Sequence, residues 1–332
     1  MNKKILIPII VIAIFIIGAA VYFIFQKPSP EPQIGDETFK PKVYITHFLH
    51  IEPGTPKNKD EFLLYAEALD KFLDIAEKHD TKISIQVEKE WAEACLKYDK
   101  KVCQMIEERG HELGTHAHNY IERVGIQKND SFDVVKQKML NYIKERKEPI
   151  DSLAEHDDTV CWGKFESNGI GRKLFLASHQ ASIELGFKNE LTAHDDLNYL
   201  EYYSHPHLLS YDNVLVEDPN GEIVLFTGKQ MTSPPRGTSP DEGEMHPERL
   251  NEFKKVFKEI YENAKAGQIN IFNEGSAGFH IEPLVDIKSG RIREEALRNF
   301  DEYLSFFDAY IKNGTAKSVT FRELSEIYKN AK

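Results

Sequence analysis

From residue 40 onward, short runs of β-branched and aromatic residues alternate with longer amphipathic segments. The runs 42–51, 82–88 and 268–273 are typical of buried strands. Segment 60–80 places apolar side chains at spacings of three and four, as one face of a helix does. This alternation predicts an α/β fold with a parallel sheet covered by helices. The pattern alone leaves open a closed barrel or an open, doubly wound sheet.

Two further segments make specific structural predictions. Segment 213–228 predicts a β-hairpin, because Pro-Asn-Gly at 219–221 lies between two apolar runs. The helical pattern that starts at residue 132 is expected to end at Pro149, since proline cannot continue the backbone hydrogen bonds of a helix.

The N-terminus carries an uncharged apolar run over residues 5–25. At about 1.5 Å per residue, a helix of this length spans the roughly 30 Å hydrocarbon core of a bilayer. The apolar part of a cleaved signal peptide is shorter, so we favour an uncleaved transmembrane helix within residues 1–26. Lys3 and Lys4 precede the run, which predicts a cytoplasmic N-terminus and a single-pass protein of the cell membrane. A Pro-rich linker, 27–40, then leads to one extracytoplasmic domain, 41–332.

Charge and motif content exclude several functions. The chain has 54 acidic and 42 basic residues, a formal net charge of −12, whereas nucleic-acid binding requires clustered Lys and Arg. No GxGxxG follows the first strand and no GxxxxGK[ST] occurs, so neither a dinucleotide site nor a P-loop is expected. Three cysteines, Cys95, Cys103 and Cys161, allow one disulfide or three buried thiols.

Histidine and glutamate side chains follow two of the predicted strands. In β/α barrels, functional residues lie at the carboxyl ends of strands. His50 and Glu52 end the first strand, and His116 and His118 end a third one. Side chains two positions apart in an extended segment point to the same side, so these two histidines and a carboxylate from another strand can hold a divalent metal. The alternative is a pair of solvated loop histidines.

The strand 268–273 leads to a further pair, Glu274 and His280. The tetrapeptide HIEP occurs at 50–53 and again at 280–283. In a closed barrel the first and last strands are neighbours, so both copies are expected at one mouth.

Other residues of chemical interest receive structural interpretations. His111 begins the third strand and faces the other end of the sheet, which favours a structural role. His205 and His207 flank a proline and are expected as exposed imidazoles in a turn. Trp162 lies near a predicted strand end, where it could stack against a sugar.

The stretch RGHELGTHAHNY at 109–120 resembles the second motif, GHE[IL]GxHxxxH, of polysaccharide deacetylases of the NodB-homology type. The order of elements and the tail at 303–328 are also similar to that family. The resemblance extends over residues 42–332 and is strongest at 105–118. It implies a NodB-like seven-stranded β/α barrel and metal-dependent removal of acetyl groups from an N-acetylated carbohydrate polymer.

The resemblance assigns roles residue by residue. His116 matches the first metal-binding histidine, but Tyr120 stands where the second belongs, and His118 is the nearby substitute. Glu52 occupies the ligand position of the family's first aspartate motif, and His50 occupies the position of the base. The arginine motif of the fourth strand is not recognisable in 161–169.

These observations together predict a membrane-anchored deacetylase that acts outside the cytoplasm. A divalent ion, most simply zinc, would be held by Glu52, His116 and His118. His50 would act as the general base or close the site as a fourth ligand, and the late histidine His280 would protonate the leaving amine.

Trp162 and Glu274 complete the prediction as substrate-binding residues. One rival function is a catalytically inactive barrel that binds glycan. The other is a glycoside hydrolase using paired carboxylates such as Glu52 and Glu274, which would have to lie about 5–10 Å apart.

Overall fold

The computed structural model describes residues 43–52, 56–118, 121–165, 169–194, 206–212, 214, 217–226, 245–266, 271–273 and 279–330. Within these ranges no helix is long and apolar enough to cross a membrane. The apolar run 5–25 and the linker lie outside them, so the membrane anchor stays a prediction. Tyr120, His205 and Glu274 also lie outside the described residues.

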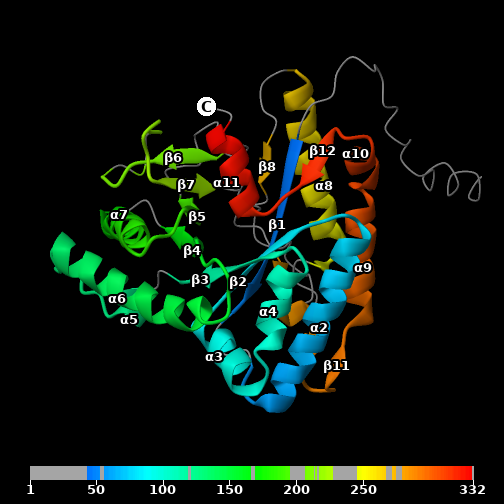
Figure 1. Cartoon of the computed structure of the whole chain (residues 1–332), viewed down its shortest axis with the longest axis horizontal. Coiled ribbons are helices and arrows are strands. Elements are labelled where there is room, and N and C mark those ends of the chain that lie inside the picture. Colours follow the sequence, from blue (N-terminus) through cyan, green and yellow to red (C-terminus); the bar gives the residue numbers. More distant parts are fainter. Residues whose placement is uncertain are drawn as a thin grey trace, which may run out of the picture. The chain divides into compact units, whose positions relative to one another are not determined.

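One curled sheet forms the centre of the domain (Figure 1). Its main path follows β1, β2, β3, β4, β5 and β7, which pair in parallel, and ends in the antiparallel edge strand β6. β8, β9 and β12 pair in parallel with β1. The strand bounds are β1 Val43–Ile51, β2 Ile83–Val87, β3 Glu112–His116, β4 Thr159–Phe165, β5 Asn189–His194, β6 His207–Leu209, β7 Ile223–Phe226, β8 Ile271–Asn273, β9 Phe279–His280 and β12 Ala316–Ser318.

This topology confirms the predicted α/β fold with a parallel sheet. It differs from a closed seven-stranded barrel, because no pairing among the described residues joins β6 or β7 to β8 or β9. The sheet is therefore a curled half-barrel. A small antiparallel hairpin, β10 (Val285–Asp286) and β11 (Arg291–Ile292), follows β9.

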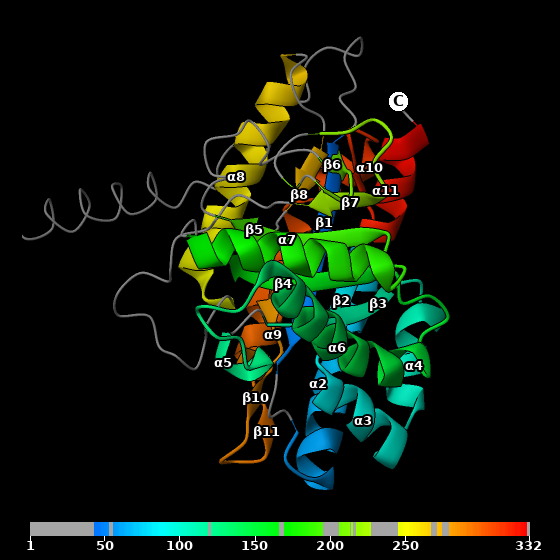
Figure 2. The ribbon, with the colours of Figure 1, turned by 90° about the vertical axis from the view of Figure 1, so that its left-hand side faces the viewer.

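Helices cover the sheet. α2, α8 and α9 lie along one part of it, and α6 and α7 pack on each other, with α6 against β3 and α7 against β4 (Figures 1 and 2). The helix bounds are α2 Lys59–Lys78, α3 Lys89–Tyr98, α4 Lys101–Glu108, α5 Ile121–Val124, α6 Phe132–Asp151, α7 Gly169–Glu184, α8 Pro247–Lys265, α9 Glu294–Ser305, α10 Asp308–Lys312 and α11 Phe321–Asn330, with a 3₁₀ turn at Glu282–Leu284. α2 starts where the Asn58 side chain accepts hydrogen bonds from the backbone N–H groups of Asp60 and Glu61, both at 3.0 Å.

Alternation along β1 separates two faces of the sheet. Val43, Ile45 and Leu49 pack into the large core beneath the covering helices. Phe48 points the other way, into an inner cluster that α11 covers with residues such as Phe321. His50 contacts the Phe48 ring and so shares this inner face. Side chains at the even positions of β1 are therefore directed to the inner face, where a site can form.

Three local expectations need correction or completion. The predicted hairpin within 213–228 needs correction: the strand that pairs antiparallel with β7 is β6 (His207–Leu209), which lies before that segment, and His207 is buried there rather than exposed in a turn. α6 continues through Pro149 to Asp151, because a proline in the last turn interrupts little of the helix. Cys95 and Cys103 form a disulfide between α3 and α4, and Cys161 is a buried thiol.

Candidate metal centre

Five predicted site residues meet on the inner face, at the carboxyl ends of β1, β3 and β9. His50 and Glu52 come from β1 and the residue after it, and His116 and His118 from β3 and the turn that follows. β9 brings His280 directly beside His50 in the register of the sheet. Residues separated by more than 200 positions are thus placed together by parallel pairing alone.

The Glu52 carboxylate lies at the centre of this group. Its Oε1 is 3.3 Å from His116 Nε2 and 3.3 Å from His280 Nε2, while its Oε2 contacts His118 Nε2. The Nε2 atoms of His116 and His118 are 3.3 Å apart. Ligand atoms bound at about 2.0–2.1 Å to one tetrahedral ion are separated by about 3.3 Å, so these spacings suit a shared ion.

Burial and mutual contact set the protonation states. Burial alone would raise the pKa of Glu52, but its contacts with His116, His118 and His280 hold that pKa well below its usual range. Burial lowers the pKa of His116 to about 4, and burial with the neighbouring imidazoles also lowers the pKa of His50. Near pH 7 Glu52 is therefore charged and these two imidazoles are neutral, which are the forms that bind metal.

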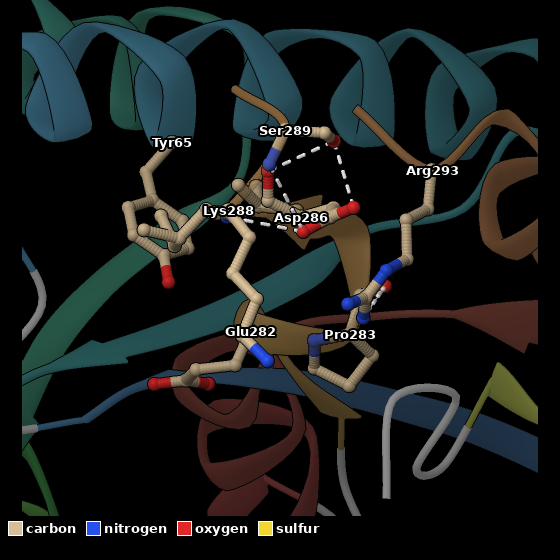
Figure 3. Close-up of a pocket in the computed structure, with 9 residues that line it drawn as sticks. Tyr65, Glu282, Pro283, Asp286, Lys288, Ser289 and Arg293 are labelled. Atoms are coloured by element: carbon tan, nitrogen blue, oxygen red, sulfur yellow. Dashed lines mark hydrogen bonds between the residues drawn. The ribbon is translucent and has the colours of Figure 1, made fainter. Parts of the chain in front are cut away.

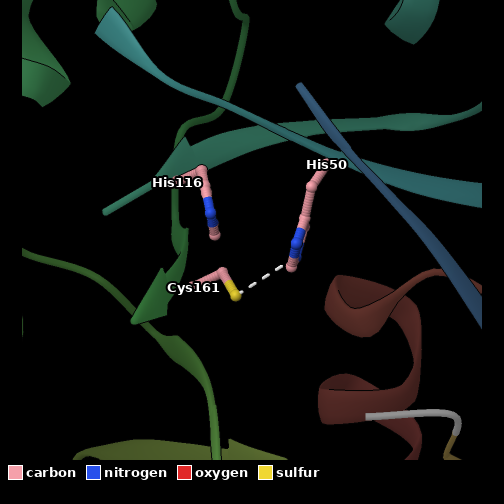
Figure 4. Close-up of side chains that lie close together, drawn as sticks. All are labelled: His50, His116 and Cys161. Atoms are coloured by element: carbon pink, nitrogen blue, oxygen red, sulfur yellow. Dashed lines mark hydrogen bonds between the residues drawn. The ribbon is translucent and has the colours of Figure 1, made fainter. Parts of the chain in front are cut away.

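His50 is enclosed by other side chains. Its ring stacks on that of His116 with centroids 4.1 Å apart and meets His280 edge-on at 5.3 Å. Its Nε2 lies 3.3 Å from the Sγ of Cys161 on β4, so a thiol lies within bonding reach of the predicted base (Figure 4). Sequence reasoning missed Cys161 as a site residue, although it pairs with His116 in the register of β3 and β4.

A second residue that sequence reasoning missed is Glu88, the residue after β2. Its carboxylate is fully buried, with Oε1 3.8 Å from His118 Nε2 and Oε2 3.4 Å from Arg146 Nε. Burial raises the pKa of Glu88 to about 7. A strand-end search extended to carboxylates would have found it, because it ends the predicted strand 82–88.

Trp162 and His111 lie away from this group. Trp162 is fully buried on the helix-covered face of the sheet, and its Nε1 donates to Ser182 Oγ at 2.9 Å. The structure does not bring it to the site, so we correct its assignment from sugar stacking to core packing. His111 lies at the opposite end of β3, where its Nδ1 accepts from the Ile83 N–H at 3.0 Å, in keeping with a structural role.

A surface groove begins two residues beyond His280 (Figure 3). It has a volume of about 540 Å³ and runs between α2 and the β10–β11 hairpin. Its lining combines a tyrosine with charged groups of both signs: Tyr65, Glu282, Asp286, Lys288 and Arg293. Such a lining suits a polar ligand rather than an apolar one.

Imidazole nitrogens and carboxylate oxygens make up the central group, a donor set that fits zinc and other divalent first-row ions. The Nε2 atoms of His116 and His118 face the Glu52 oxygens, as the ligand atoms of one metal ion do. The described residues therefore fit the divalent metal that the sequence predicts.

This chain is similar to known proteins in fold only. No protein-family model matches the sequence, and no curated protein matches it. A crystal structure from Mycobacterium smegmatis, provisionally named a polysaccharide deacetylase, is similar with a TM-score of 0.53 at 11% identity, over 90% of this chain and 93% of that one. This likeness shows that the two chains share an α/β half-barrel fold.

Two other structures are more distant. A 4-alpha-glucanotransferase from Thermococcus litoralis gives a TM-score of 0.47 at 12% identity, over 86% of this chain and 40% of that one. A mutant of a CE4 family pseudoenzyme with restored enzymatic activity gives 0.40 at 12% identity, over 90% and 73%. Both scores are too low to support an argument about function.

Proposed function

We propose that the protein is a metal-dependent hydrolase that removes acetyl groups from an N-acetylated carbohydrate. The observation that carries the proposal is the Glu52 carboxylate surrounded by His116, His118 and His280 at the strand ends of the inner face. The fold shared with the M. smegmatis structure, named for this activity, supports it.

Glu52, His116 and His118 would hold the ion, for which zinc is the simplest choice given the nitrogen and oxygen donors. A divalent ion held there would supply polarisation of the acetyl carbonyl and would lower the pKa of water at the site. The chain's own contribution is to keep Glu52 ionised and His116 neutral through the contacts described above.

Two histidines are available for proton transfer. His50, neutral because it is buried among imidazoles, would accept the proton of the attacking water. The side chain of His280 is one-third exposed, so it can reach a substrate and deliver a proton to the leaving nitrogen. Water thereby adds to the carbonyl carbon, the C–N bond breaks, and acetate and a free amine leave.

The groove that Glu282 lines is proposed to bind further sugar units, because its carboxylates, lysine and arginine offer donors and acceptors to hydroxyl groups. An extracytoplasmic location is part of the proposal. The Cys95–Cys103 disulfide supports it, since disulfides persist in oxidising compartments. The apolar run 5–25 supports attachment to the cell membrane.

Acetate release from N-acetylated oligosaccharides tests the proposal. The metal-loaded chain should release acetate, and a chelator or the double variant His116→Ala/His118→Ala should abolish the release. Binding of the oligosaccharide without any acetate release would instead identify a glycan-binding protein. Release of reducing ends, without acetate, would identify a glycoside hydrolase.

A further inference from the structure

Within the described residues, Glu88 has no hydrogen bond to account for its burial. Its side chain is completely buried, and no donor in the described part of the chain reaches either carboxylate oxygen in hydrogen-bonding geometry. Burying a carboxylate without such partners is costly unless a cation pairs with it. Different groups lie near the two carboxylate oxygens of Glu88.

Arg146 accounts for one oxygen. Glu88 Oε2 is 3.4 Å from Arg146 Nε, and that guanidinium is itself fixed, because it lies 3.5 Å from the centroid of the Tyr142 ring and donates to the Tyr142 carbonyl at 3.3 Å. Arg146 therefore holds the carboxylate through Oε2.

The other oxygen belongs to the metal-binding group. Glu88 Oε1 is 3.8 Å from His118 Nε2 and 3.8 Å from Arg123 Nη1, whose side chain is partly exposed. The ligand atoms of Glu52, Glu88, His116 and His118 all lie within 4.8 Å of one another. An ion among them would therefore be within reach of Glu88 after small side-chain movements.

We propose that Glu88 is a fourth protein ligand of the divalent ion, bound through Oε1 while Arg146 holds Oε2. The inference rests on the proposed function, which supplies the ion. It accounts for a departure from the deacetylase motif: Tyr120 replaces the motif's second histidine, and the end of β2 adds a donor that the motif lacks.

The ligand set changes the chemistry of the site. Two carboxylates balance the charge of a divalent ion. A site with Glu88 also has a larger share of oxygen donors than the three-ligand site, so it binds harder ions such as Mn²⁺ relatively better. With four protein ligands, room for water and substrate requires an ion with five or six ligands in total.

Cobalt binding tests the inference without an activity assay. The full-length chain is freed of metal with a chelator and titrated with Co²⁺, and both the dissociation constant and the visible spectrum are recorded. Glu88→Gln should weaken binding by more than about 100-fold and change the spectrum, because a neutral amide replaces the anionic carboxylate ligand. Glu90→Gln, an exposed carboxylate two residues on, is the matched control and should give wild-type values.

Two more variants separate a ligand from an ion-pair partner. Glu88→Asp keeps the charge beside the arginines, and so the fold, but withdraws the oxygen, so it should also change the spectrum. Arg146→Lys should leave the spectrum unchanged. The inference would be overturned if Glu88→Gln or Glu88→Asp gave the wild-type spectrum. It would also be overturned if Arg146→Lys gave the same spectrum as Glu88→Gln. In both cases the proposed function would stand. Failure of the wild-type chain to bind Co²⁺ would overturn both.

Discussion

His111 provides a quantitative test of the division between structural and metal-binding histidines. Its side chain is 1% exposed, its Nδ1 accepts from the Ile83 N–H, and burial lowers its pKa from 6.5 to about 4. Protonation of Nδ1 would break that hydrogen bond. His111→Asn retains an acceptor at the same distance from the backbone but removes the titration.

The sign and size of the effect follow from linkage. In the unfolded chain the His111 imidazole is protonated near pH 6.5, whereas in the folded chain it is protonated only near pH 4. The free energy of unfolding therefore falls as the pH falls between these two values. Each pH unit corresponds to about 1.4 kcal/mol, so the full loss is about 3 kcal/mol. Above pH 7 the native pKa has no effect on stability.

Urea unfolding at several pH values between 7 and 4 measures this loss. The free energy of unfolding of wild type relative to His111→Asn should fall by about 3 kcal/mol over that range. His156→Asn, at an exposed position, should show no such trend. The metal content of His111→Asn should equal that of wild type. A flat difference, or loss of metal, would refute the structural assignment.

Three further predictions concern the core, the disulfide and the proton donor. Trp162→Ala should lower the free energy of unfolding by about 3–5 kcal/mol in urea denaturation, with no loss of carbohydrate affinity at permissive temperature; weaker carbohydrate binding by the folded variant would contradict its core assignment. Replacing Cys95 and Cys103 by serine should cost about 2.5 kcal/mol, seen as a lower melting temperature that dithiothreitol lowers no further; unchanged melting would count against the bond. His280→Gln should lower kcat by about 100-fold or more while metal content stays at the wild-type level; full activity would exclude it as the proton donor.

The parallel sheet could be predicted from sequence because each strand carries its own local signal. The run 42–51 became β1 (Val43–Ile51), since its β-branched and aromatic residues fit a strand buried on both faces. β6 was misplaced because His207–Leu209 follows a proline and has no alternating pattern, and only its pairing with β7 makes it a strand. The pairing of two distant segments cannot be predicted from the residues of either segment alone.

The same distinction holds for the site. His116 and Glu52 could be predicted from strand-end position and motif resemblance, because parallel strands place their carboxyl ends together. Glu88 and Cys161 carry no motif, and their relation to the site depends on which side chains the register of β2 and β4 brings inward. Trp162 was expected near the site from its strand-end position alone, but its side chain packs on the helix-covered face, because neighbouring residues of a strand point to opposite faces.

The central claim is that the inner-face histidines and Glu52 bind a divalent metal. Elemental analysis of the purified full-length chain, after incubation with zinc, cobalt, nickel or manganese and removal of unbound ion, tests it most directly. The account predicts near-stoichiometric metal in the wild-type chain and none above background in His116→Ala/His118→Ala. Wild-type protein without bound metal after exposure to every ion, or a double variant that binds as much as wild type, would contradict it.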